Sequence, residues 1–575
     1  MYALQLAIVL LLKFSKLAGA QDLEASETVW AVFAFTVHGD SVPEIVPQPR
    51  TLTPVGAQNL YNVGSAFRDR YVMGASSNVE NTDSPNFFVK GLSQHRLNAD
   101  EVKIYSGWDQ YVQASALAFM QGFYPPITGQ NNTLSYVDGT YLLANGSVGT
   151  APLNDYQYPR IYAAGASDPN SIYLSGQENC EMHQIMELDY QSSDQAQSVD
   201  NDAAEFYSGL YNQAFEGLVE DPTWVSYSNA IEVSEYLEYG YVHNASLQGS
   251  VSASDLQRAR VLADQYAFAT NGNVSASGLN EGDMIRAIAG RTLSRLILEL
   301  FEENMETQGT SPKMTLLFGG PETIVAFAAI TKLASSMNNN FYGLPSLGSS
   351  LVLEMFSMNS SPHSTYPDMS ELYVRFLFRN SSSTDEGFIN YPLFGLSPSV
   401  IDTPFSEFSA ALNQILLPST EEWCNTCKSS SIFCDGSNPA GETSPKPSLN
   451  LAAAGAIGAG VTLGVVFLIG IIAWLCGSGV HRKQKQKQSN EGGFRGGAKL
   501  QADQDVTFTK PRGGLFAETV LGSGKKAPKS HARTGSWEME NQRHPAETSQ
   551  EALNFEDEVE DATAGAEPVK VYEAV

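Results

Sequence analysis

The sequence has few basic residues for its size. Its 575 residues include 34 Lys and Arg against 63 Asp and Glu, a formal net charge of −29 at pH 7. Nearly all of this excess lies before residue 481, because the segment 481–575 holds 14 basic and 15 acidic residues. A strongly acidic chain repels polyanions, which excludes non-specific binding of nucleic acid. Hydrophobic residues make up 42% of the chain, which excludes a fibrous or wholly disordered protein.

Cysteine is also scarce, with five in the whole chain. Four of them, Cys180, Cys424, Cys427 and Cys434, precede a long hydrophobic segment, and Cys476 follows it. An even number in an oxidising compartment predicts two disulfides, with three pairings open. The Cys424-x2-Cys427 spacing resembles half of a zinc site, but no second Cys or His pair completes it. We therefore expect disulfides, no metal and no other cofactor.

Two hydrophobic segments define the expected topology. Residues 2–12 are apolar and a small-residue cleavage site follows at 18–20, so 1–20 is predicted to be a signal peptide rather than a buried core helix. Residues 451–475 carry no charge and as a helix would span roughly 37 Å, enough to cross a bilayer. Basic residues at 481–487 place the C-terminal side in the cytosol. These features predict a single-pass type I protein of the secretory pathway, in the plasma membrane or a vacuolar or lysosomal-type membrane.

The flanking segments agree with this topology. Six N-x-[ST] glycosylation sequons all precede the predicted membrane helix: Asn131, Asn145, Asn244, Asn273, Asn359 and Asn380. Residues 429–450 are rich in Ser, Pro and Gly and are predicted to form a stalk, and 476–575 a disordered cytosolic tail. A GPI signal is the rival hypothesis, but this long polar tail argues against it. Gly460-x3-Gly464 in the membrane segment suggests a homo-oligomer.

The region 21–428 is predicted to be an α/β domain, with a mixed central sheet flanked by helices. Apolar runs at 29–35, 102–105, 314–318, 351–356 and 372–378 are typical of buried strands. Helical spacing follows at 54–71, 108–123, 283–303 and 323–333. This alternation favours an α/β core of about 28–128 and 279–416, with a largely helical insertion at about 129–278.

Four stretches in this order resemble the histidine acid phosphatase family, the acid phosphatase and phytase branch of the histidine phosphatase superfamily. They are TVHGDSVP at 36–43, LTPVG with RDRY at 52–71, VKIYS with GFYPP at 102–126, and LLFGGPETI at 316–324. The family patterns are R-H-G-x-R-x-P, L-T-x-x-G…R-x-R-Y, V-x-x-R-S…G-x-Y-P-P and a strand followed by H-D. The resemblance covers about residues 28–415. It implies phosphoryl transfer through a phosphohistidine, with arginines that hold the phosphate and an acid that protonates the leaving alcohol.

When the family's functional residues are aligned with this sequence one by one, the chain has the family's residue at one of six positions. His38 matches the nucleophile, whereas Val37, Ser41 and Tyr105 stand where phosphate-binding arginines are expected. The H-D pair falls on Gly320 and Pro321, or on Pro321 and Glu322 if the alignment slips by one residue. Glu322 is a candidate general acid, because burial raises the pKa of a carboxyl group.

The lost arginines decide the functional hypothesis. Three lost charged hydrogen bonds at ~1.5–3 kcal/mol each would cost about three to six orders of magnitude in rate or affinity. Arg68 and Arg70 match the helix arginines of the family and are expected to be structural. We therefore expect a catalytically impaired, phosphatase-like membrane protein that binds or senses a small-molecule or protein ligand, with His38 as a vestigial site. The alternative is an active acid phosphatase with a modified site that uses His38.

Overall fold

The computed structural model describes residues 26–74, 87–127, 143–147, 149, 151–335, 338–359 and 365–434. The predicted signal peptide, most of the stalk, the predicted membrane segment at 451–475 and the tail lie outside these residues, as does Asn131. Within the described ranges, no helix is long and apolar enough to cross a bilayer.

The core is an eight-stranded mixed sheet with the order β3-β2-β4-β1-β5-β6-β7, and β8 also pairs with β6. The strands are β1 (Ser26–Val37), β2 (Val102–Gly107), β3 (Ile161–Ala164), β4 (Met314–Gly319), β5 (Ser350–Asn359), β6 (Leu372–Arg379), β7 (Ile389–Tyr391) and β8 (Asp402–Pro404). Strands β1 to β4 pair in parallel, and β5 to β8 are antiparallel to their partners. The predicted α/β class and all five predicted strands are confirmed.

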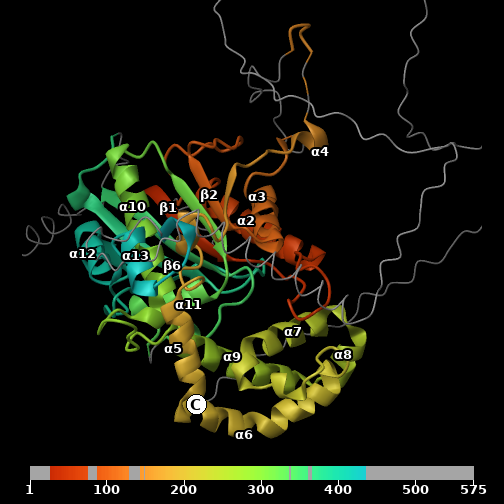
Figure 1. Cartoon of the computed structure of the whole chain (residues 1–575). Helices are drawn as coiled ribbons and strands as arrows, with labels where there is room; N and C mark the ends of the chain where they lie inside the picture. Colours follow the sequence, from red (N-terminus) through yellow and green to blue (C-terminus); the bar gives the residue numbers. More distant parts are fainter. Residues whose placement is uncertain are drawn as a thin grey trace, which may run out of the picture. The chain divides into compact units, whose positions relative to one another are not determined.

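Helices cover both faces of this sheet (Figure 1). The helices are α2 (Pro54–Tyr71), α3 (Gln110–Phe123), α4 (Pro152–Asp155), α5 (Glu181–Ser192), α6 (Asp194–Leu210), α7 (Ala230–His243), α8 (Ala245–Ser250), α9 (Ala253–Asn271), α10 (Ile288–Glu306), α11 (Glu322–Ile330), α12 (Phe405–Ile415) and α13 (Thr420–Cys427). One apolar cluster joins α2 and α3 to one face of the sheet. A second cluster joins α10, α11 and α12 to the other face.

Local chemistry explains why α2 begins where it does. Pro54 occupies the first turn, and the Thr53 side chain accepts a hydrogen bond from the Gly56 N–H at 3.0 Å. Further along α2, Gly64 allows a close approach to α3, because a Cβ there would lie 1.9 Å from the Phe119 carbonyl oxygen. The contact with α3 therefore requires glycine at this position.

A buried charge network ties α2 to the antiparallel half of the sheet. The Glu354 side chain is fully buried and accepts hydrogen bonds from Arg70 at 2.8 Å, Tyr71 at 2.7 Å and Arg375 at 3.1 Å. Arg375 also pairs with Glu27 at 2.9 Å. These contacts hold the pKa of the Glu354 carboxyl below its usual range despite its burial. The predicted structural role of Arg70 is thus what the structure shows.

Helices α5 to α9 form a cap with an apolar cluster of its own, drawn in yellow and olive in Figure 1. The range 129–278 was expected to be largely helical, but it also contains β3, which pairs with β2 at the edge of the core sheet. The helical cap therefore begins only at Glu181. Strand β3 has four residues and only one of them is buried, so it lacks the apolar run that predicted the other strands.

The four cysteines before the membrane segment form two disulfides, Cys180–Cys427 and Cys424–Cys434. The predicted disulfides are therefore present, and the structure selects one of the three pairings. The first bond links α13 to the start of α5, across 247 residues of sequence. The C-terminal end of the described chain is thereby fixed to the cap.

Candidate functional site

His38 lies directly after β1, at the carboxyl end of the parallel strands, where α/β proteins usually bind ligands. It is 6% exposed, and its Nδ1 lies 2.9 Å from the Gly39 carbonyl oxygen. A carbonyl can only accept, so Nδ1 donates and Nε2 keeps its lone pair in the neutral ring. The pKa of His38 is lowered to about 4, chiefly by burial and also by the charge of Arg50, whereas the contact with the Gly39 carbonyl opposes the shift. The imidazole is therefore neutral across the physiological range.

An aromatic ring and one guanidinium surround this histidine. The Tyr111 ring meets the His38 ring edge to face, with 4.7 Å between centroids. The Arg50 guanidinium lies over the Tyr111 ring at 4.3 Å, and it pairs with the Glu235 carboxylate of α7 at 2.5 Å. A cation within reach of His38 is therefore present, but a carboxylate already neutralises it.

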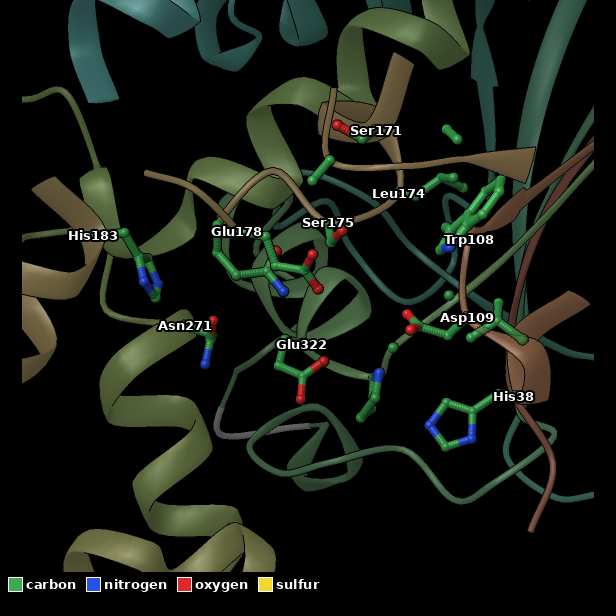
Figure 2. Close-up of a pocket in the computed structure, with 18 of the residues that line it drawn as sticks. His38, Trp108, Asp109, Ser171, Leu174, Ser175, Glu178, His183, Asn271 and Glu322 are labelled. Carbon is green, nitrogen blue, oxygen red and sulfur yellow. The ribbon is translucent and has the colours of Figure 1, made fainter. Parts of the chain in front are cut away.

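Glu322 opens α11, just beyond the end of β4. The pKa of its carboxyl is raised to about 7, chiefly by burial and also by the negative charges of Glu178 and Glu235, whereas a backbone hydrogen bond and the charge of Arg50 oppose the shift. Figure 2 shows the Glu322 carboxyl between Glu178 and His38. A group with this pKa can hold a proton or release it near neutral pH.

These side chains line a cavity of about 560 Å³ between the core and the cap. The core supplies His38, Arg50, Asp109 and Glu322, and the cap and the segment before it supply the facing wall. Four carboxylates line the cavity: Asp109, Glu178, Glu187 and Glu322. Arg50 is the single Lys or Arg among the described lining residues. The cavity is therefore acidic, like the chain as a whole.

A second hollow of about 270 Å³ shares His38, Arg50 and Glu322 with the first. Its one additional cation, Arg260, pairs with Glu238 at 3.1 Å and with Asp264 at 2.9 Å. Each guanidinium in the two hollows is thus already bound by a carboxylate.

Asp40 lies two residues after His38. Its Oδ2 accepts a hydrogen bond from the Thr53 hydroxyl and lies 2.7 Å from Nε2 of His243, the last residue of α7. Asp40 therefore connects the first turn of α2 to the cap.

The structure brings most of the predicted site residues together. Gly320, Pro321 and Glu322 line the cavity with His38, and Ser41 lines the second hollow. Val37 and Tyr105 do not reach either space. Val37 is fully buried in the apolar core, because the last residue of β1 points to the α10 side of the sheet.

Tyr105 stacks on Tyr162 of the neighbouring strand, with 5.5 Å between ring centroids. The residue from this part of the chain that contacts His38 is Tyr111, in the first turn of α3. The family resemblance predicted a site residue at Tyr105 in β2, whereas the side chain that contacts His38 is Tyr111 of the following helix, α3. Of the family-like arginines, Arg68 donates to the carbonyls of Phe123 and Gln94, which is a structural role.

Sequence reasoning did not find Glu178 and Glu235 as site residues. Glu178 precedes Cys180 in an irregular segment, and Glu235 lies in the middle of α7. Nothing in their local sequence marks them, since only the docking of the cap brings them to His38. Within the described part of the chain, no group of His, Cys, Asp and Glu is arranged to hold a metal ion.

Four of the predicted glycosylation sequons can be placed in the fold. Asn145 and Asn244 are exposed, and Asn273 and Asn380 are half-buried. Asn244 caps α8 through its Oδ1, which leaves its Nδ2 free for a glycan. The side chain of Asn359 lies outside the described set.

The fold and the cavity define a class: a mixed α/β protein with a cavity at its strand ends, between the core and a helical cap. The family model for the histidine phosphatase superfamily (branch 2) matches residues 44–379. This range is more than half of the chain, so the chain belongs to that superfamily. The match begins after His38, so membership alone assigns no role to this histidine.

Several solved structures are similar to the chain at low identity. The phytase of Citrobacter braakii is 11% identical, with a TM-score of 0.41, over 69% of this chain and 99% of that one. The Klebsiella sp. ASR1 phytase is 15% identical, with a TM-score of 0.42, over 69% and 98%. The multiple inositol polyphosphate phosphatase of Bifidobacterium longum, in complex with inositol hexasulfate, is 11% identical, with a TM-score of 0.39, over 70% and 95%. No curated protein sequence matches the chain.

Proposed function

We propose that this chain is a type I membrane protein of the secretory pathway whose phosphatase-like domain binds or senses a ligand and has lost efficient phosphate hydrolysis. One observation carries this proposal. The cavity at His38 contains one guanidinium, Arg50, which Glu235 already pairs, and four carboxylates line the same walls.

The physical reason is the charge of the substrate. A phosphate ester carries negative charge throughout the reaction, so its binding needs cations aimed at the phosphate oxygens. At an effective dielectric constant of about 20, a carboxylate about 8 Å from a phosphate charge opposes it by roughly 2 kcal/mol. Several such carboxylates outweigh a single paired arginine.

The test is a phosphatase assay on the purified full-length chain with p-nitrophenyl phosphate between pH 4.5 and 7.5. We expect the wild type and a His38→Ala variant to release the same small amount of product. Turnover that disappears in His38→Ala would overturn the proposal, provided that both proteins show the same thermal unfolding.

A second candidate function is an active phosphomonoester hydrolase with a rebuilt site. The observation that favours it is the placement of Glu322, with its pKa of about 7, on the cavity that also exposes the neutral His38. In this reaction Nε2 of His38 would bond to phosphorus as the bond to the alcohol oxygen breaks, and Glu322 would give its proton to that oxygen. Water would then release phosphate from the histidine.

Rapid acid-free quenching with a ³²P-labelled phosphate ester distinguishes the two candidates. Label bound to the wild type and absent from His38→Ala would support hydrolysis. Absence of label in both, together with normal folding, would support loss of catalysis.

The membrane topology has its own test. A protease applied to sealed vesicles that contain the full-length chain should remove the tail after residue 476 and spare the glycosylated domain. Protection of the tail, or a chain that alkaline carbonate extracts from the membrane, would contradict the proposed type I anchor. Self-association through Gly460 and Gly464 predicts that a Gly464→Leu variant loses detergent-resistant dimers, while Gly470→Leu in the same segment keeps them.

A further inference from the structure

Buried hydrogen-bond acceptors line the cavity wall opposite His38. Asn271, at the end of α9, is 5% exposed, and its Nδ2 donates to the Ala267 carbonyl and the Thr270 hydroxyl. Its Oδ1 therefore remains as an acceptor, and this oxygen has no hydrogen-bond partner. The buried Oε1 of Gln177, on the same wall, also has none. A buried acceptor without a partner is energetically costly, and a ligand that donates hydrogen bonds would satisfy it.

His183 lies beside Asn271 and is also 5% exposed (Figure 2). Its Nε2 has no hydrogen bond of normal geometry, although longer hydrogen-bonding contacts with the Asn271 side chain and the Thr270 backbone partly offset the effect of burial on the pKa of His183. Burial lowers the pKa of His183, so the ring is neutral and brings no positive charge to this wall.

Negative charge gathers in front of these acceptors. Burial and, after it, the repulsion of Asp109 raise the pKa of Glu178, and the charge of Glu178 adds to the effect of burial on the pKa of Glu322. The three carboxylates are thus close enough to affect one another, and no Lys or Arg among the described lining residues pairs with Asp109 or Glu178. A positive charge bound between them would relieve this repulsion.

An exposed aromatic side chain, Trp108, also lines the cavity. Trp108 is 68% exposed, and it lies above Asp109 in Figure 2. An exposed indole face beside carboxylates attracts organic cations through its π-electrons.

We propose that this cavity binds a small organic cation that carries several N–H donors, such as a linear polyamine. Its ammonium groups would lie among Asp109, Glu178 and Glu322 and donate hydrogen bonds to Asn271 Oδ1 and Gln177 Oε1. The cavity volume of about 560 Å³ lies within the range of small-molecule sites. This inference rests on the proposed function, because it names the ligand class of the same pocket.

The test is isothermal titration calorimetry of the full-length chain with spermidine at pH 7.5 and about 0.15 M salt, with inorganic phosphate and myo-inositol as comparison ligands. We expect one saturable spermidine site per chain, and no saturable binding of phosphate or inositol. Glu322→Gln and Glu178→Gln should each weaken spermidine binding at least fivefold. Binding at pH 5 should also be at least fivefold weaker than at pH 7.5, because the Glu322 carboxyl, whose pKa is about 7, then holds a proton.

Glu205→Gln is the matched control, since it removes the same charge from an exposed position of α6. An equal loss in Glu205→Gln would overturn the cation proposal, because it would show only general attraction of spermidine to an acidic surface. The absence of saturable spermidine binding to the wild type would also overturn it. Two separate glutamate variants keep the test valid if one of them unfolds in a thermal scan. If spermidine does not bind and no His38-dependent hydrolysis is found, the cation proposal fails and the proposed function stands. Tight phosphate binding with turnover would contradict both the cation proposal and the proposed function.

Discussion

The pairing of Arg50 with Glu235 makes a direct prediction about phosphate. If Glu235 neutralises the one guanidinium near His38, then Glu235→Gln should release it to bind an anion. The variant keeps the size of the side chain and removes one negative charge from the second hollow. By the same Coulomb argument, a carboxylate about 8 Å from the bound anion costs roughly 2 kcal/mol, so phosphate affinity should rise about thirtyfold.

The assay is a ³¹P NMR titration of the full-length wild type and Glu235→Gln with inorganic phosphate at pH 7.5. We expect no measurable shift at millimolar concentrations for the wild type and a saturable shift for the variant. Arg50→Gln in the Glu235→Gln background should abolish the gain, because the released guanidinium is its source.

Glu205→Gln again serves as the control for a general loss of negative charge. An unchanged affinity in Glu235→Gln, or an equal gain in Glu205→Gln, would refute the reasoning. Either result would mean that the Arg50 pair does not decide whether this pocket accepts phosphate.

Three further predictions concern stability and pH. Glu354→Gln should lower the free energy of unfolding by about 3–5 kcal/mol in urea denaturation, because it removes the buried carboxylate that pairs with both Arg70 and Arg375 and leaves Arg375 with Glu27 as its near carboxylate. A loss below about 1 kcal/mol would contradict this. Gly64→Ala should unfold at a clearly lower temperature than wild type, since its Cβ would overlap the Phe119 carbonyl, whereas Gly249→Ala, with open space around it, should not. The pKa of Glu322 rises to about 7 on folding, so the folded state keeps a proton that the unfolded chain releases near pH 4. The free energy of unfolding should therefore fall as the pH rises from about 4 to about 7. Glu322→Gln should flatten that fall in denaturation curves recorded from pH 4.5 to 8, and parallel curves for the two proteins would count against the raised pKa.

The fold was largely predictable because its central elements are specified locally. Strands such as β1 and β4 are buried on both faces and therefore appear as continuous apolar runs. Helix α2 has its cap at Thr53 and begins and ends at the predicted residues. Strands β7 and β8 are three residues each and were not predicted, since their pairing with β6 depends on partners distant in sequence.

The site was only half predictable, and the reason is its two-sided construction. His38 and Glu322 follow buried strands, a position that the sequence reveals, and the resemblance to a family gave them roles to test. Glu178 and Glu235 come from the cap side, more than a hundred residues from His38 in sequence. Their effect on the site exists only after the cap docks through contacts such as His243 with Asp40.

The overall charge of −29 does not by itself determine what this pocket binds. At physiological ionic strength the Debye length is about 8 Å, so most surface carboxylates are screened from a ligand at His38. The carboxylates that matter are those that line the cavity beside His38. Asp109, Glu178 and Glu322 influence one another there, and the single cation near them is held by Glu235. The acidic composition and the lost arginines therefore point in the same direction because Asp109, Glu178 and Glu322 line the cavity and Glu235 of the cap pairs with its one guanidinium.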